Sequence, residues 1–194
     1  MTDIETHPLS PFAPPHAQVL MLGSFPPPRA RWKMDFYYPN FQNDMWRIFG
    51  LVFFDDKDHF VAEGGKAFKE ALLRDFLQHK GIALSDTAHK VRRLQGNASD
   101  KFLQIVERVD LAALLEKMPA CRTITTTGEL ATDTLLSLMP PGTAKPVIGS
   151  HVVTTFAGRP LQLYRLPSSS RAYPLALSKK AEIYGRFFAA IGLL

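Results

Sequence analysis

Cysteine is almost absent from this chain of 194 residues, in which Cys121 is the only one. A single cysteine cannot form an internal disulfide, and it argues against a metal site built from cysteine ligands. The sequence therefore predicts a protein without disulfides or bound metal, suited to a reducing compartment.

Long apolar runs are absent as well. No run reaches the roughly 18 residues that a membrane-spanning helix needs. Residues 1–16 are polar and rich in proline, unlike a secretory signal. We therefore expect a cytoplasmic protein without a membrane partner.

An excess of acidic residues is missing too, since 23 Lys and Arg stand against 18 Asp and Glu and give a net charge of +5. This mild basic bias is compatible with a polyanionic partner, although many soluble proteins share it.

One sizeable core is within reach of the chain, because 46% of its residues are hydrophobic. Near the N-terminus, Pro8, Pro11, Pro14 and Pro15 are incompatible with regular structure. We expect residues 1–16 to form an extended arm and residues 17–194 to form a single domain, present as a monomer.

An unusual stretch, residues 23–46, follows the first apolar segment. Residues 17–22 form a short apolar run typical of a buried parallel strand, and Gly23 with three prolines ends it. The chain then interleaves aromatic and amide side chains with Arg29, Arg31 and Lys33. Flat rings beside cations suit a nucleobase and its phosphate, so this stretch is a candidate active-site loop.

A helix is expected to begin within this stretch. Asn40 is a suitable N-cap, and apolar side chains recur at helical spacing from Phe41 to Val52. On a wheel of about 100° per residue, Asn43 lies nearly opposite the apolar face. Asn43 is therefore either a solvated residue of the first turn or a polar group of a site.

Further helices and strands alternate in the manner of an α/β protein. We predict helices over residues 66–80, with Phe68, Leu72 and Phe76 on one stripe, over residues 100–118 with a break near Asp110, after Gly128 and after residue 174. We predict strands over residues 82–84 and 122–127 and a hairpin over residues 151–166.

The predicted architecture is a three-layer α/β/α sandwich around a central, mostly parallel sheet of about four strands. The residues Gly23, Asp86, Thr127 and Pro167 follow these strands and should converge at one edge of the sheet. Asp86 has two interpretations: the N-cap of a following helical turn, which is the commoner fate, or a contact to a substrate or a water.

The segment before the last helix, residues 166–174, has the sequence L-P-S-S-S-R-A-Y-P. Serines and free backbone N–H groups ahead of a helix suit a phosphate. The alternative is an ordinary helix start with Pro174 in its first turn. Lys179, Lys180 and Arg186 are expected on the outer face of this helix, where they would add positive charge.

Three of these segments resemble a known family. They are G-S-F-P at residues 23–26, Y-Y-x-x-x-x-N-x-x-W at residues 37–46 and L-P-S-S-S at residues 166–170. They resemble the active-site motifs of the uracil-DNA glycosylase superfamily, and most of all its hypoxanthine-DNA glycosylase branch and the mismatch-specific uracil glycosylases. Residues 81–86 and 125–128 also fit the strand ends of the family, so the resemblance covers nearly the whole chain after the arm.

The resemblance implies a DNA repair enzyme without a cofactor. Such a monofunctional glycosylase flips uracil or hypoxanthine out of damaged or mismatched DNA and hydrolyses the N-glycosidic bond, leaving an abasic site. Asn43 matches the family's motif asparagine and is the expected catalytic residue, because an amide can donate to the leaving base or orient a water. The expected substrate contacts are Gly23, Ser24, Phe25, Pro26, Tyr37, Tyr38, Asp86 and Ser168. The expected DNA contacts are Pro167, Ser169, Ser170, Arg171, Tyr173 and Lys179.

Two positions depart from the family pattern. Phe25 stands two residues after the motif glycine, where many members carry Asp or Asn to activate water. Ser168 stands in the region where other branches use a histidine against the leaving base. These differences favour the hypoxanthine-type branch or another base lesion.

Two other classes of function stay open. One is a hydrolase with Ser24 or Ser168 as nucleophile and His151 as base, although no G-x-S-x-G motif is present. The other is a catalytically inactive nucleic-acid or nucleotide-binding protein on the same fold, which the replaced acid would explain.

Overall fold

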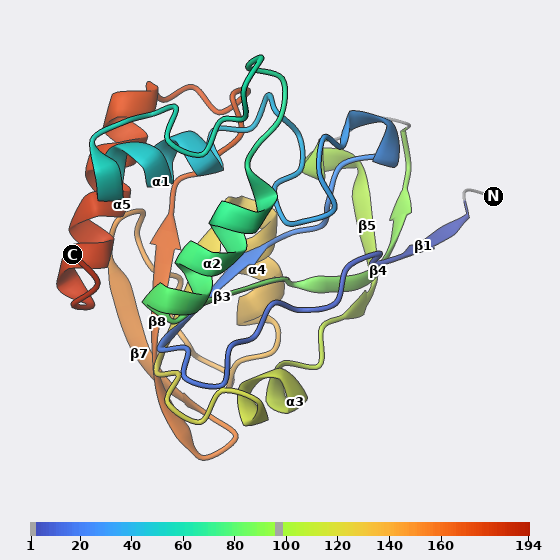
Figure 1. The fold of residues 1–194 in the computed structure, drawn as a ribbon. Helices are drawn as coiled ribbons and strands as arrows, with labels where there is room; N and C mark the ends of the chain where they lie inside the picture. The colour runs from blue at the N-terminus through green and yellow to red at the C-terminus, as the bar shows by residue number, and fades with distance from the viewer. Residues whose placement is uncertain (1–2, 96–98) are drawn as a thin grey trace.

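The computed structural model describes residues 3–95 and 99–194 and contains a central five-stranded sheet in the order β3-β2-β6-β8-β7 (Figure 1). The strands β2 (Val19–Gly23), β3 (Ile82–Asp86), β6 (Thr123–Thr127) and β8 (Arg159–Leu166) are parallel to one another. The edge strand β7 (His151–Phe156) runs antiparallel to β8. The predicted four-stranded sheet is therefore wrong, because the first arm of the hairpin adds a fifth, antiparallel strand.

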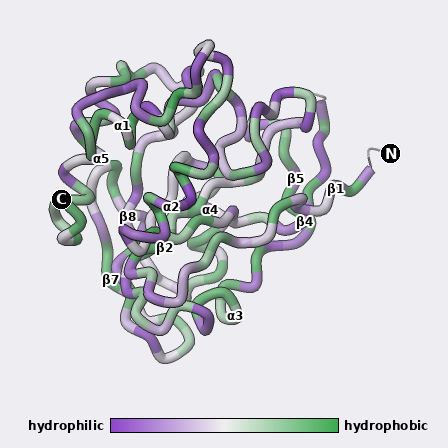
Figure 2. The backbone as a smooth tube through the Cα atoms, in the orientation of Figure 1, coloured by the Kyte–Doolittle hydropathy of each residue, from purple (hydrophilic) through white to green (hydrophobic). Residues whose placement is uncertain are grey.

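Helices cover both faces of this sheet, since alternate residues of a strand point to opposite sides. Val19 and Met21 pack in one cluster with α1 (Met45–Phe54), α2 (Glu70–Lys80) and α5 (Leu177–Ala190). Leu20 and Leu22 pack in a second cluster with α3 (Leu111–Glu116) and α4 (Glu129–Leu136). Every residue of β2, β3 and β6 is buried, as expected of parallel strands between two helical layers. Figure 2 shows strongly hydrophobic stretches in α1 and α3.

A second, antiparallel sheet was not predicted. It joins β1 (Ile4–Thr6), β4 (Ala88–Arg93) and β5 (Leu103–Arg108) in the order β1-β4-β5. The first half of the helix predicted over residues 100–118 is wrong, because a 3-10 turn over Asp100–Phe102 leads into β5. The second half is helical: α3 starts after its cap Asp110, where the break was predicted. The β-branched pair Ile105 and Val106 favours the strand.

The strand β4 also removes one interpretation of Asp86. Because β4 begins at Ala88, no helical turn follows Asp86, and the preferred N-cap assignment is wrong. The basic residues His89, Lys90, Arg92 and Arg93 lie on β4.

The N-terminal residues contain regular structure, which the prolines had argued against. The strand β1 precedes the first proline, and further along Phe12 forms an isolated antiparallel bridge with Leu84 of β3. None of the helices in the described part of the chain has the length and apolar character that a membrane crossing requires.

Two helices start later than predicted. The first, α1, begins at Met45 with Asp44 as its cap residue, and the Asn40 side chain instead accepts the N–H of Gln42 at 3.0 Å. The second, α2, begins at Glu70, and its Leu72 is exposed while Leu73 and Leu77 are buried. Asn43 therefore belongs to the loop before α1 and not to a helical face.

Lys180 corrects the expected outer face of the last helix. Its side chain is 1% exposed. Its Nζ donates to Asp44 Oδ2 at 3.3 Å and to the Ser170 carbonyl at 2.8 Å. These two contacts join α5 to the start of α1 and to residues 166–174, the serine-rich segment. Lys179, its neighbour, is exposed and pairs with Glu182.

We expect Lys180→Ala to destabilise the protein by about 3 kcal/mol or more, because it leaves Asp44 buried without one of its cations. Lys179→Ala is the matched control and should change stability by less than about 0.5 kcal/mol. Chemical denaturation of the three proteins measures this difference. Equal stability of the two variants would contradict a structural role for the pair.

Candidate functional site

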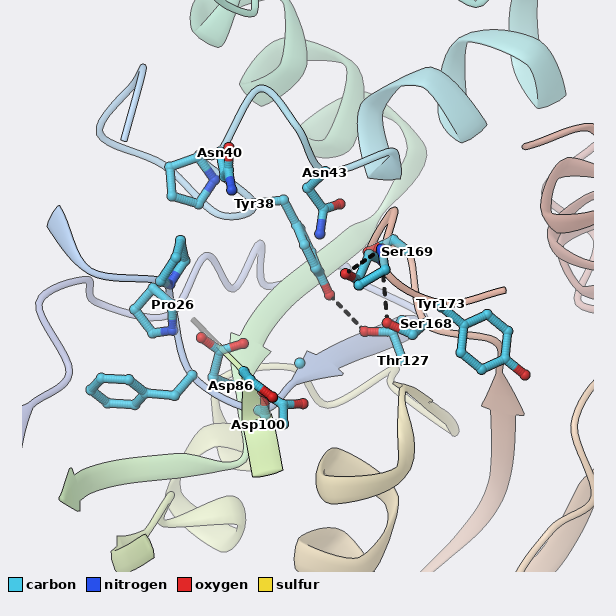
Figure 3. A pocket seen from close by; sticks show the side chains of 18 of the residues that line it. Pro26, Tyr38, Asn40, Asn43, Asp86, Asp100, Thr127, Ser168, Ser169 and Tyr173 are labelled. Atoms are coloured by element: carbon cyan, nitrogen blue, oxygen red, sulfur yellow. Dashed lines mark hydrogen bonds between the residues drawn. The ribbon is translucent and has the colours of Figure 1, made fainter. Parts of the chain in front are cut away.

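A cavity of about 590 Å³ opens at the carboxyl edge of the parallel strands (Figure 3). Gly23, Asp86, Thr127 and Ser168, which come from the ends of β2, β3, β6 and β8, all line it. The sheet register pairs Gly23 with Asp86 directly. The predicted convergence of the strand ends is thus present in the fold, as parallel α/β sheets generally show.

Most of the residues proposed from sequence meet in this cavity. Those that line it are Gly23, Ser24, Phe25, Pro26, Tyr37, Tyr38, Asn43, Asp86, Ser168, Ser169, Ser170 and Tyr173. The lining does not include Pro167, Arg171 or Lys179. Arg171 lines a second, neighbouring cleft together with Arg47 and Lys69.

Gly23 allows two cavity walls to approach each other. A Cβ atom at this position would lie 2.5 Å from Asp86 Oδ1 and 3.3 Å from the Tyr38 hydroxyl. The first distance is shorter than any side chain tolerates, so the position of the Asp86 carboxylate depends on glycine at residue 23.

The two tyrosines occupy different environments. Tyr38 has a φ of 51°, its hydroxyl lies 3.1 Å from Thr127 Oγ1, and its ring meets Trp46 edge to face. Tyr37 is buried and donates its hydroxyl to the Ser10 carbonyl at 3.2 Å. Burial, together with the charge of Asp86, raises the pKa of both phenols far above the usual value. Both therefore remain neutral.

The Asn43 amide has a defined orientation. Its Oδ1 accepts the N–H of Met45 at 2.9 Å, in the first turn of α1. Because the oxygen is occupied by this contact, the NH2 group is the end that faces the cavity (Figure 3). Asn43 thus presents a hydrogen-bond donor to a bound molecule.

The Asp86 carboxylate faces the cavity from the opposite side. Its Oδ2 lies 2.8 Å from His7 Nε2, and both side chains are almost fully buried. Sequence reasoning missed His7, because residues 1–16 were expected to be a separate arm and no spacing connects position 7 with position 86.

Asp100 is a second carboxylate in the cavity that sequence reasoning missed. Its Oδ1 accepts the hydroxyl of Ser24 at 2.7 Å. Burial raises the pKa of this carboxyl, and the nearby Asp86 charge acts in the same direction. The cavity therefore contains two acids although Phe25 occupies the position of the family's motif acid. The helix predicted over residues 100–118 concealed Asp100, which sits instead at the turn before β5.

The serine-rich segment is fixed against the start of α1. Asn43 and Ser170 form an isolated bridge, and the Asp44 N–H donates to the Ser169 carbonyl at 2.9 Å. The Ser168 hydroxyl accepts the N–H of Ser170 at 3.2 Å. Two of the three segments that resemble family motifs, residues 37–46 and 166–170, therefore form one wall of the cavity.

Two cations predicted to contact DNA lie outside the cavity. Arg171 donates from Nε to Asp44 Oδ1 at 2.9 Å, and its side chain is 43% exposed. Lys179 is more exposed still and lies on α5. Among the described residues, no group of three or more His, Cys, Asp or Glu side chains could hold a metal ion.

Comparison with known proteins shows the fold of this chain. No protein-family model matches it, and no curated protein does. Among solved structures, it is similar to the solution NMR structure of a "putative uracil DNA glycosylase" from Methanosarcina acetivorans, with a TM-score of 0.64 and 22% sequence identity. The similarity covers 96% of this chain and 99% of that one. The two chains thus share a fold over nearly their full lengths.

Asp100→Asn should change how stability depends on pH. A carboxyl whose pKa is raised in the fold stabilises the protein while protonated, and this stabilisation is lost as pH rises from the ordinary carboxyl range through the raised pKa. The asparagine never ionises and can still accept from Ser24. We therefore expect the variant to melt above the wild type at neutral pH, by about 2 °C if the gain is near 1 kcal/mol.

The comparison needs melting curves from pH 3 to 8. The advantage of Asp100→Asn should vanish at the acidic end, where the wild-type carboxyl is protonated as well. Asp75→Asn, which replaces an exposed carboxylate on α2, is the control. A difference in melting temperature that stays constant across the pH range would contradict the raised pKa.

Proposed function

We propose that this protein is a DNA repair enzyme, a monofunctional glycosylase that hydrolyses the N-glycosidic bond of a flipped deaminated base, hypoxanthine or uracil, and leaves an abasic site. The observation that carries the proposal is the cavity at the strand ends, in which the Asn43 NH2 group lies across from the Asp86 carboxylate. The motif resemblance and the fold shared with the archaeal protein support it.

The cavity suits an extruded base in size and polarity. Small-molecule sites typically have volumes of about 300–1,000 Å³, and this cavity has about 590 Å³. Uracil and hypoxanthine both carry a carbonyl acceptor and a ring N–H donor. Asn43 offers a donor to the first and Asp86 an acceptor to the second.

Bond cleavage places negative charge on the departing base and positive charge on the sugar, as in glycoside hydrolysis. The Asn43 NH2 group donates to the base as this negative charge develops, which lowers the barrier. Orientation of a water through Oδ1 is the less suitable role for Asn43, because the Met45 N–H occupies that atom.

The attacking water is assigned to Asp100. A carboxyl with a raised pKa is a better proton acceptor than an ordinary one at neutral pH, provided that it is ionised. Its contact with Ser24 fixes one oxygen at the cavity wall. In this chain, Asp100 thus takes the role that the motif acid has in many members of the family, which is to activate the water.

A panel of duplexes that each contain one lesion tests the function. The purified protein is incubated with DNA containing uracil, hypoxanthine, xanthine or a normal base, and abasic sites are revealed by alkaline cleavage. Cleavage at a deaminated base and not at the normal base is expected. A shift of the DNA on a gel without any abasic site would favour the alternative, a catalytically inactive binding protein.

Asn43→Asp separates the catalytic role of Asn43 from its structural one. The aspartate keeps an oxygen for the Met45 N–H but removes the NH2 donor. We expect single-turnover excision to fall about a hundredfold or more, the scale for losing one polar catalytic group, while the melting temperature stays within the range of a surface substitution. Asn43→Ala, which removes both contacts, should lose similar activity.

Gln42→Ala is the control for these variants, since Gln42 is an exposed neighbour outside the cavity. Wild-type excision by a folded Asn43→Asp protein would remove the amide from the mechanism.

Binding to DNA should depend on salt through Arg171 and Lys179. If each approaches a phosphate, Arg171→Gln and Lys179→Gln should each reduce the slope of log K against log salt by about one unit, for every DNA sequence alike. Lys180 is left out because it is buried. Lys117, the exposed C-cap residue of α3, supplies the control variant Lys117→Gln, since α3 lies far from α5 (Figure 1). If the wild type and the three variants all show the same slope, Arg171 and Lys179 do not contact DNA.

A further inference from the structure

The N-terminal strap, defined here as residues 3–12, runs beside β4 and β3 and is held at both ends. At one end, β1 pairs with β4, and the His7 N–H donates to the His89 carbonyl at 2.8 Å. At the other end, Phe12 exchanges two backbone hydrogen bonds with Leu84, at 2.9 and 2.8 Å. The strap therefore carries His7 to a fixed place beside β3.

The His7 ring is fixed on every side. Nε2 lies 2.8 Å from Asp86 Oδ2, and Nδ1 lies within 3.1 Å of the Leu9 backbone N–H. Nδ1 also lies 2.9 Å from the Leu9 carbonyl oxygen, so this nitrogen either accepts from the Leu9 N–H or donates to the Leu9 carbonyl. In both cases Nε2 donates to Asp86, because a carboxylate oxygen is the acceptor. Phe25 and Tyr37 flank the ring, with centroids 5.2 and 6.0 Å away.

The contact with His7 gives the two oxygens of Asp86 different surroundings. Oδ2 is occupied by His7, while Oδ1 points towards Gly23, inside the cavity. Without His7, the Asp86 side chain would lose the partner that sets its rotamer. Phe25 and Tyr37 offer no replacement, since the first is apolar and the second donates its hydroxyl to Ser10.

We propose that His7 is a positioning residue, which holds Asp86 so that Oδ1 accepts the ring N–H of the flipped base. The proposal rests on the function proposed above. A bare carboxylate beside the base would repel the negative charge that develops on it as the bond breaks. The hydrogen bond from His7 draws charge away from the cavity, so Asp86 can recognise the base without opposing its departure.

The first test compares three variants. His7→Ala removes the contact and should lower single-turnover excision about tenfold or more, the scale of a hydrogen bond to a charged group. His7→Gln keeps an amide donor of similar reach and should restore part of the rate. His16→Ala is the matched control, because His16 belongs to the same N-terminal region but is exposed, and its Nε2 lies 2.7 Å from the Gln78 carbonyl oxygen, away from Asp86.

A double-mutant cycle then separates positioning from general destabilisation. If His7 acts through Asp86, His7→Ala should slow excision in the wild type and have little further effect when combined with Asp86→Asn. Multiplicative losses from the two substitutions would overturn the proposal. Full activity of a folded His7→Ala protein would overturn it as well, and melting temperatures identify variants that fail to fold.

Binding measurements keep this test apart from the proposed function. The affinity for a hypoxanthine-containing duplex, measured by fluorescence anisotropy against an undamaged duplex, does not require excision. If the wild type excises no base but prefers the lesion, the glycosylase assignment fails, and His7→Ala should still reduce that preference. If the wild type neither excises nor prefers any lesion, both proposals fall.

Discussion

The buried carboxylate of Asp44 connects the parts of the molecule on which the candidate site depends. It accepts from Lys180 of α5 and from Arg171 of the serine-rich segment, while its own N–H donates to the Ser169 carbonyl. Asp44 is also the cap residue of α1, directly after Asn43. One side chain thus holds two segments together that lie more than a hundred residues apart in the chain. Removal of one partner from a buried charge leaves that charge uncompensated, so each of these contacts stabilises the junction.

This junction matters because hydrogen-bond donors and acceptors lie on opposite sides of the cavity. The wall formed by the two motif segments presents the Asn43 donor, and the opposite side carries Asp86 and Asp100. Each of these three side chains has one polar atom that is hydrogen-bonded within the protein. Asn43 is bonded to Met45, Asp86 to His7, and Asp100 to Ser24. Their remaining atoms therefore face the cavity in set directions, which is how a preformed site discriminates between ligands.

Local patterns predicted the parts of the fold that are governed by local physics. Short apolar runs with abrupt ends predicted β2 and β3, β-branched residues predicted β6, and the turn at Ala157 and Gly158 predicted the hairpin. The cavity lining followed from them, because parallel strands bring their carboxyl ends to one edge. Helix starts were less predictable, since the loop before α1 is held by Asp44 and the serine-rich segment, which are distant in sequence.

The residues that sequence reasoning missed depend on contacts that no local pattern records. His7 reaches Asp86 only because β1 pairs with β4, and a three-residue strand ahead of four prolines gives a weak signal. Asp100 was assigned to a helix because the apolar residues of β5 and α3 together imitate helical spacing. The β-branched pair Ile105 and Val106 was the available indication of a strand.

The tight contact between Gly23 and Asp86 constrains how such a sequence can vary. These residues sit directly opposite each other on neighbouring strands, and a single methyl group at position 23 would lie 2.5 Å from the carboxylate oxygen. A larger side chain at position 23 therefore demands a smaller or differently placed one at position 86. Related sequences should change the two positions together, and a designer who wishes to reshape the cavity must treat them as one unit.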